Sequence, residues 1–281
     1  MIILKPQVEL WVQDDPIAHV ARCARICYAS DKTTGNEAMY QRLIDSNHKS
    51  MLRHQSVYYI IPYKGWRLAN LQRYEECPYI EFKYDSNHIY VSTNKQFVIE
   101  HNDFDESYHE FEVDGPQFEN TPLGFSLMRY TFKVVTQIST SRELNRVSPN
   151  NIAEQSTRYV NLSRKGGAIC QPHWMTDIML GDCFHIPTDN PICEKYFNSC
   201  IKSFNEYNDL IKLGMKPQDA RGVLPLDTAT VCIYTYSYNE WRHIIDLRYY
   251  STTGAAHPNA VIIAGMIREK LIEAGHEFRD K

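Results

Sequence analysis

The chain has 281 residues, of which 43% are hydrophobic and 12% aromatic, so it can bury a large core and is not a disordered protein. Its net charge of −4 gives no general attraction to nucleic acid. No apolar run approaches the ~20 residues of a membrane span, and the apolar start is too short for a signal sequence. We therefore expect a soluble, cytoplasmic protein that binds neither nucleic acid nor membrane.

The first half of the chain carries both helix and strand signals. Residues 15–30 begin with an acid and a proline and continue with apolar residues at helical spacing, which predicts a helix. A second helix fits residues 36–47, and the aromatic, β-branched run 57–63 predicts a strand. Residues 89–100 also resemble a strand, whereas the acidic stretch 100–124 resembles a solvated loop.

The second half contains clearer helices. Residues 128–139 alternate like a strand and lead into a short helix over 140–146. A long amphipathic helix is predicted over 190–214, ending on a glycine, and another over 256–275. Residues 216–225 form a helical turn closed by a proline. Together these elements predict an α+β fold in one domain.

The eight cysteines form no CxxC pair, and a chain of this length needs no disulfide staples. Cys23 and Cys27 lie on one face of the first predicted helix, where they could either bind a metal or pack as thiols. The segments CQPHW and CFHIP place a histidine near a cysteine but do not repeat with metal-ligand spacing. We predict packed thiols and no metal site.

Residues 152–159, IAEQSTRY, gather a carboxylate, an amide, a hydroxyl and a guanidinium just after the helix-breaking SPNN. A solvated loop is one interpretation. However, Arg146, Arg158, Arg221 and Arg248 each lie beside apolar residues near the end of a predicted element. One such arginine indicates a structural ion pair, because a buried guanidinium needs a carboxylate or phosphate partner. Four of them beside this loop indicate a pocket for an anionic ligand such as a nucleotide.

The segment RVSPNNIAEQSTRY resembles the signature of the flavin-dependent thymidylate synthases, which reads RHR, seven residues and Ser, continued as E-x-S-x-R-Y. Further segments resemble landmarks of that family in family order: ARICY, NHKSMLRH, SRELNR, DARGVLP, EWRHIIDLR and AAHP. The resemblance covers most of the chain. It implies a single domain over residues 1–281, with an antiparallel sheet flanked by helices and an inserted or irregular segment at about 64–123.

The resemblance also implies a dUMP site and an enzyme that uses FAD. The residues that would line the dUMP site are Glu143, Arg146, Glu154, Gln155, Ser156, Thr157, Arg158, Arg221 and Arg248. Arg248 would be the catalytic residue: it would hold the pyrimidine and favour its N3-deprotonated form, which makes C5 nucleophilic without an enzyme cysteine. The residues that would lie beside the flavin and folate are His48, Ser50, Arg146, Glu154, Ser237, Asn239 and His243.

The reaction that this resemblance implies converts dUMP to dTMP. Methylenetetrahydrofolate donates the carbon, and NADPH supplies electrons through FAD. Members of the family are homotetramers whose active sites are shared between subunits.

The chain departs from the family pattern on the flavin side. Val147 and Ser148 stand where the family has His and a second Arg, and Asn239 stands where an Arg is usual. Losing a hydrogen bond to a charged group costs about 1.5–3 kcal/mol, so two losses would weaken FAD binding roughly a hundredfold. Arg164 and Lys165 are candidates to compensate.

Two other functions stay open from the sequence. One is a folate-dependent hydroxymethyltransferase on a deoxypyrimidine monophosphate, which needs no net reduction. The other is a nucleotide-binding homologue without catalysis. The site residues also have structural interpretations: His48 as a capping or core histidine, His257 as a helix-start residue, and Arg248 in an ion pair with Asp246 or Glu240.

Overall fold

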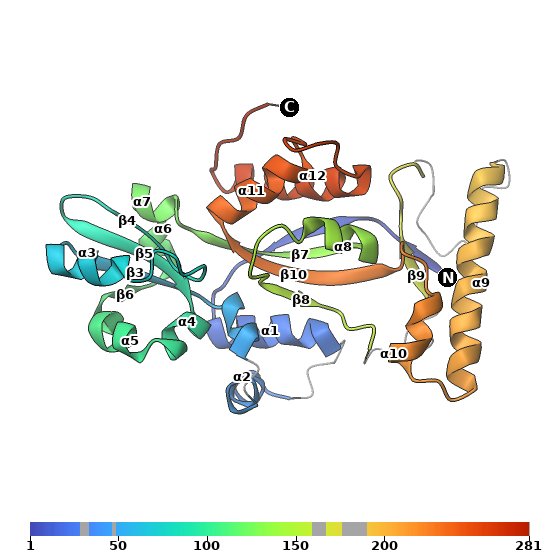
Figure 1. Cartoon of the computed structure of the whole chain (residues 1–281), viewed down its shortest axis with the longest axis horizontal. Coiled ribbons are helices and arrows are strands. Elements are labelled where there is room, and N and C mark those ends of the chain that lie inside the picture. The colour runs from blue at the N-terminus through green and yellow to red at the C-terminus, as the bar shows by residue number, and fades with distance from the viewer. Residues whose placement is uncertain (29–33, 47–48, 159–166, 176–189, 281) are drawn as a thin grey trace.

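Figure 1 shows the computed structural model, which describes residues 1–28, 34–46, 49–158, 167–175 and 190–280. Two antiparallel sheets of four strands each are accompanied by helices, with a short parallel strand pair at the opposite end from the second sheet. The predicted α+β class with antiparallel sheet and flanking helices is therefore confirmed.

The central sheet has the strand order β2, β7, β10, β8. Its strands are β2 (Gln7–Trp11), β7 (Arg129–Gln137), β8 (Ile152–Glu154) and β10 (Ala229–Ser237). β7 and β10 pair along their full length, from Arg129 opposite Ser237 to Gln137 opposite Ala229. Both strands are buried along nearly all of their length, because helices cover the two faces of the sheet.

Helices α8 (Ile138–Leu144), α11 (Tyr238–Arg248) and α12 (Pro258–Glu273) cover one face of the central sheet, and α1 (Pro16–Tyr28) and α2 (Asn36–Asp45) lie on the other side (Figure 1). Trp241 on α11 is buried between this helix and the central sheet. Its ring packs edge-on against Phe132 at 5.1 Å, and its indole Nε1 donates to the Tyr130 carbonyl at 3.0 Å. These contacts fix α11 on the sheet.

The second sheet is built from β3 and from three strands of the segment expected to be inserted or irregular, about 64–123. Its order is β4, β5, β3, β6, with strands β3 (Ser56–Pro62), β4 (Glu81–Tyr84), β5 (His88–Asn94) and β6 (Glu112–Val113). Around it lie η1 (Lys49–His54), α3 (Gly65–Gln72), α4 (Lys95–Glu100), α5 (Asn102–Tyr108), η2 (His109–Phe111), α6 (Gly115–Glu119) and α7 (Pro122–Phe125). A separate apolar core that includes Tyr59 and Val91 holds this part together.

Two expectations for this segment were wrong. The stretch 100–124 is mostly helical rather than loop-like, because Phe104 and Tyr108 lie one helical turn apart and are buried behind an acidic outer face. The strand expected over 89–100 ends at Asn94, whose side chain accepts a hydrogen bond from the Phe97 N–H and starts a helix.

We keep as a proposal that residues 1–281 form one domain with an insertion at about 64–123. The apolar core supports it, because Tyr58, Tyr90 and Phe118 from the second sheet belong to the same buried cluster as Phe132 of the central sheet. The Arg129 N–H also donates to the Tyr58 hydroxyl at 3.1 Å, which joins β7 to β3.

At the other end of the molecule, β1 (Ile2–Leu4) pairs in parallel with β9 (Ala168–Cys170). The helical elements beside this pair are α9 (Pro191–Lys212), α10 (Pro217–Ala220) and η4 (Arg221–Val223). The long helix ends as predicted, just before Gly214, which adopts a positive φ of 95° that favours glycine. Among the described residues, no helix has both the length and the apolar character needed to cross a membrane.

A buried row of polar side chains ties α1 and η1 to the central sheet. His19 Nε2 lies 3.2 Å from Thr131 Oγ1, Thr131 Oγ1 lies 2.7 Å from Thr235 Oγ1, and Thr235 Oγ1 lies 2.8 Å from His54 Nδ1. Burial lowers the pKa of His19 to about 4, and the charge of Arg22 lowers it too. Burial likewise lowers the pKa of His54 to about 3, so both imidazoles are neutral at pH 7.

These two histidines predict a loss of stability in mild acid. In the unfolded chain each imidazole binds a proton near pH 6.5, whereas in the folded chain it does so only near pH 4 or 3. Between these values the unfolded state holds more protons, so the free energy of unfolding falls as the pH falls. The slope approaches about 1.4 kcal/mol per pH unit for each histidine.

The measurement is urea denaturation at a series of pH values from 7.5 to 4.5. His54→Gln should be less stable than the wild type at pH 7.5 but lose less stability on acidification. His109→Gln is the control, because His109 is exposed and the same substitution there removes an imidazole from the surface rather than from the core. Equal pH slopes for His54→Gln and the wild type would contradict the argument.

Candidate functional site

The residue predicted to be catalytic, Arg248, is the last residue of α11 and is only 8% exposed. Its Nε donates to the Glu143 carbonyl at 2.6 Å, and its Nη2 lies 3.4 Å from the Glu143 carboxylate. The guanidinium of Arg146 lies 3.8 Å from the same carboxylate. The structure therefore brings together Glu143, Arg146 and Arg248, and the expected ion-pair partners Asp246 and Glu240 are not the ones Arg248 uses.

This cluster has more positive than negative charge. Two guanidinium groups share one carboxylate, and burial together with the charge of Arg146 lowers the pKa of Arg248, while Glu143 opposes that shift. The last turn of α11 partly offsets the cost of placing two guanidinium groups close together, because the C-terminal end of a helix carries a partial negative charge. A partly buried cation of this kind is suited to an anionic or carbonyl-rich planar ligand.

The segment IAEQSTRY is not entirely a loop, because Ile152–Glu154 forms β8 at the edge of the central sheet. The chain then leaves the strand at Gln155, whose N–H donates to Val231, and Ser156, whose N–H donates to the Cys27 carbonyl at 3.0 Å. The Ser156 hydroxyl accepts from the Arg158 N–H at 3.1 Å. Tyr159 lies outside the described residues.

Glu154 points toward α8 from the end of β8. Its carboxylate is 2.9 Å from Arg142, and it accepts hydrogen bonds from the Ser141 and Thr230 hydroxyls at 3.1 and 3.3 Å. The sequence did not single out Arg142, although it lies beside Glu143 in the predicted short helix.

Arg221 lies on exposed η4 and donates to the Thr157 hydroxyl at 2.9 Å. A second group of predicted residues is thus formed by Thr157 and Arg221, next to Ser156 and Arg158. The first group is Glu143, Arg146 and Arg248. Glu154 lies between the two groups, because it ends β8 shortly before Ser156 and binds Ser141 and Arg142 of α8, the helix that carries Glu143.

The residues predicted to lie beside the cofactors are scattered in one chain. Ser50 on η1 and His243 on α11 are exposed, and His48 lies outside the described residues. His257 accepts from the Asn259 N–H and caps α12, as its helix-start interpretation predicted. Val147, which stands where the family has a polar histidine, packs against the apolar core.

Ser237 and Asn239 lie at the N-terminal end of α11, where both bind Glu81. The Asn239 amide donates to Glu81 at 2.8 Å, and the Ser237 hydroxyl donates to the other oxygen of the same carboxylate. The Ser237 N–H donates to Glu240 at 2.7 Å, which completes a capping box. Glu81 was missed from the sequence, because it lies 156 and 158 residues from its two partners and no local pattern marks it.

The diphosphate of FAD needs hydrogen-bond donors or cations that are free to bind it. The donors at the N-terminal end of α11 already bind a carboxylate, and position 239 offers an amide in place of a guanidinium. A carboxylate at hydrogen-bond distance repels a diphosphate. These residues do not fit that part of FAD.

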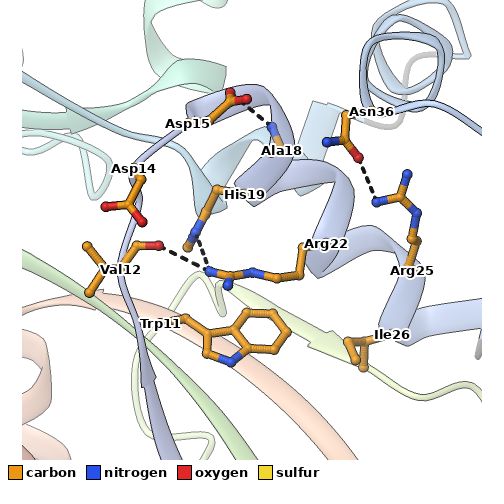
Figure 2. A pocket seen from close by; sticks show the side chains of 10 residues that line it. All are labelled: Trp11, Val12, Asp14, Asp15, Ala18, His19, Arg22, Arg25, Ile26 and Asn36. Atoms are coloured by element: carbon orange, nitrogen blue, oxygen red, sulfur yellow. Dashed lines mark hydrogen bonds between the residues drawn. The ribbon is translucent and has the colours of Figure 1, made fainter. Parts of the chain in front are cut away.

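Two hollows lie away from the Arg248 cluster. A cavity of about 460 Å³ is bordered by Trp11, Asp14, His19, Arg22 and Arg25 on the α1 side of the sheet (Figure 2). A second, of about 420 Å³, lies between β4 and the start of α11 and is bordered by Glu81, Lys83 and Asn239, with Glu75 and Gln72. Only Asn239 of the predicted site residues borders either one.

The cysteines are packed thiols where the structure describes them. Burial raises the pKa of Cys23 and of Cys170 to about 12. Burial also raises the pKa of Cys27, Cys200 and Cys232. Within the described ranges, no group of three or more His, Cys, Asp or Glu side chains is placed to hold a metal ion.

Comparison with known proteins shows that the chain is related to a family of thymidylate synthase complementing proteins. A family model described as "Thymidylate synthase complementing protein" matches residues 124–274, which is more than half of the chain. The chain belongs to this family, known as ThyX, and the resemblance seen in the sequence is confirmed. The matched segment contains both groups of predicted nucleotide residues and α11, but neither Ser50 nor Glu81.

No curated protein sequence matches the chain. Two solved structures of a UMP/dUMP methylase, PolB from Streptomyces cacaoi, bound with 5-Br dUMP or 5-Br UMP, share 17% identity and a TM-score of 0.46 with it. Each comparison covers 97% of this chain and 93% or 92% of the PolB chain.

Proposed function

We propose that the protein is an enzyme that transfers a one-carbon unit to C5 of dUMP, giving dTMP, with methylenetetrahydrofolate as the carbon donor. As the resemblance implies, NADPH would supply the reducing electrons through FAD. The observation that carries this proposal is the buried guanidinium of Arg248, held by Glu143 beside Arg146. The family membership of the segment that contains these residues supports it.

Arg248 has the properties that pyrimidine activation requires. Its planar fork is fixed through Nε to a backbone carbonyl, so its position is set by α8 rather than by solvent. A preorganised cation stabilises negative charge that develops on a bound ring, and such a donor can contribute about 3–4 kcal/mol. The N3-deprotonated pyrimidine, with a nucleophilic C5, is the form that this charge favours.

Among the described residues, the most deeply buried thiols are poorly suited to act as a cysteine nucleophile. The thiolate is the reactive form, and burial raises the pKa of Cys23, Cys170 and Cys232 away from neutral pH. This is the opposite of what an attacking cysteine needs. The proposed mechanism therefore uses electrostatic activation by Arg248.

The phosphate of the nucleotide would be bound by the second group. Ser156 and Thr157 offer hydroxyls, Arg158 and Arg221 offer guanidinium groups, and Arg221 already contacts Thr157. These are the donor types that phosphate oxygens accept from.

We further propose that the protein is a homotetramer with shared active sites. The resemblance implies this assembly, in which a second subunit would supply part of each site. Symmetric assembly with such shared sites is the common way for an oligomer to complete a pocket.

The hydroxymethyltransferase remains the second candidate, and the contact of Glu81 with Ser237 and Asn239 favours it. Hydroxymethyl transfer needs no net reduction, so it tolerates a poor flavin site. The product distinguishes the two functions: mass spectrometry of the nucleotide after incubation with dUMP and methylenetetrahydrofolate should show dTMP only when NADPH and FAD are added. A hydroxymethyl product formed without them would establish the alternative.

The first prediction for this site concerns turnover. Arg248→Ala should lower turnover about a hundredfold or more while the fold persists, because the preorganised charge is lost. Arg248→Lys should recover little, because an ammonium cannot reproduce the planar fork. Steady-state rates, with circular dichroism as the fold check, measure both.

The cysteines are the control for that experiment. Replacing each described cysteine in turn by Ala should leave turnover within a few-fold. A folded but inactive cysteine variant, together with an active Arg248→Ala enzyme, would show that the thiol-free mechanism is wrong.

The second prediction concerns nucleotide affinity. Arg158→Ala and Arg221→Ala should each weaken dUMP binding at least tenfold, because each removes a charge-assisted contact to phosphate. Isothermal titration calorimetry measures the change. Lys212→Ala on α9 is a matched control, because its ammonium pairs with Asp209 at an exposed site. Unchanged affinity in both arginine variants would remove these residues from the site.

The third prediction concerns assembly. Light scattering at micromolar concentration should give four times the chain mass of 32.8 kDa. In mixtures of Arg248→Ala and Arg221→Ala chains, activity should partly return, because some mixed sites take both intact residues. A monomeric mass, or no recovery in the mixtures, would exclude sites shared in this way.

A further inference from the structure

Glu81 is the first residue of β4 and is partly buried between the second sheet and α11. Its backbone lies opposite Ser92 in the β4–β5 pairing, so the position of the carboxylate is set by the second sheet. One oxygen accepts from the Ser237 hydroxyl, and the other accepts from the Asn239 amide at 2.8 Å. One carboxylate thus binds two donors at the start of one helix.

This end of α11 is an electrostatically favourable place for a carboxylate. The first turn of an α-helix carries a partial positive charge from its unpaired N–H groups. Glu240 uses one of them through the capping box, where the Ser237 N–H donates to it. Glu81 accepts from the side chains of Ser237 and Asn239, so two carboxylates, those of Glu81 and Glu240, lie at the N-terminal end of α11.

Two cations, Arg129 and Lys83, lie in the surroundings of Glu81, and neither forms an ion pair with it among the described residues. Burial raises the pKa of Glu240, and the charge of Glu81 raises it too, while the buried guanidinium of Arg129 opposes that shift. Lys83 donates to the Ser126 hydroxyl at 2.8 Å. Glu75 adds a second carboxylate to the rim of the cavity of about 420 Å³. The cavity is therefore bordered by two carboxylates and one ammonium, with the carboxylate of Glu81 on the two donors at the place where the resemblance puts the flavin.

We propose that Glu81 acts as an internal anion that occupies the donors of Ser237 and Asn239 and excludes the diphosphate of FAD, so that this chain binds FAD weakly. The inference rests on the proposed function only for the assignment of these two residues to the flavin side. It goes beyond the loss of arginines, because it names a residue outside the matched family segment that actively sets cofactor affinity.

The test measures FAD binding directly, without turnover. Titration of the purified protein with FAD, followed by flavin fluorescence, gives the dissociation constant for the wild type, Glu81→Gln and Glu81→Ala. Removing the charge should tighten FAD binding at least tenfold in both variants. Glu75→Gln is the matched control: it removes the same charge from the rim of the same cavity, but Glu75 makes no contact with Ser237 or Asn239 in the described hydrogen bonds.

A double-variant cycle separates competition from general loosening. Asn239→Arg alone should gain little, because the new guanidinium would pair with Glu81. Asn239→Arg combined with Glu81→Gln should tighten FAD binding by more than the product of the two single effects. If Glu81 only joins the two sheets, its variants will lower the melting temperature and leave FAD affinity unchanged.

Three results overturn the proposal: wild-type protein that retains stoichiometric FAD through purification, Glu81 variants with unchanged FAD affinity, or a control variant that tightens binding as much as they do. Calorimetry with dUMP on the same samples keeps the two proposals apart. Intact dUMP binding with unchanged FAD affinity defeats only the role of Glu81. Loss of dUMP binding in the wild type defeats the proposed function.

Discussion

The pairing of β7 with β10 is the constraint on which the arrangement of charged residues depends. Because the two strands are antiparallel and in register from end to end, the helices that follow them start at opposite ends of the sheet. α8 and α11 then run back over the same face and approach each other with their C-terminal ends (Figure 1). The contact of Glu143 with Arg248 is the point where they meet.

The two ends of α11 hold opposite charges. The helix has 11 residues and spans about 16 Å, with Glu81 and Glu240 at its N-terminal end and Arg248 at its C-terminal end. Each arrangement agrees with the direction of the helix dipole. The same element therefore separates a cationic cluster, which belongs to the matched family segment, from a pair of carboxylates to which the second sheet contributes.

The sequence was informative wherever the signal was local. The helices over Pro16–Tyr28, Pro191–Lys212 and Pro258–Glu273 followed from apolar spacing and from their end residues. The helix over Asn102–Tyr108 was hidden, because its two buried aromatics are surrounded by acids that resemble a solvated loop. β8 was hidden for another reason: three residues of edge strand carry no periodicity that distinguishes them from a turn.

The site shows the same division. Arg248, Glu143 and Arg146 could be chosen from motif positions, and the structure brings them together. The partner of Arg248 could not be derived, because nearby Asp246 and Glu240 were equally plausible until the fold placed α8 beside α11. Glu81 was beyond the reach of sequence reasoning, because its partners lie 156 and 158 residues away, at the end of β10 and the start of α11, and its own segment has no unusual feature.

The row of His19, Thr131, Thr235 and His54 has a defined proton donor at its His19 end. Arg22 is always protonated and can only donate, and its Nη2 lies 3.1 Å from His19 Nδ1 (Figure 2). His19 must therefore carry its hydrogen on Nε2 and donate it to Thr131. The row then continues from Thr131 to the Thr235 hydroxyl at 2.7 Å and from Thr235 to His54 Nδ1 at 2.8 Å. An exposed guanidinium stacked 4.0 Å over Trp11 thus selects the tautomer of His19, an imidazole buried on the same face of the central sheet as Trp11.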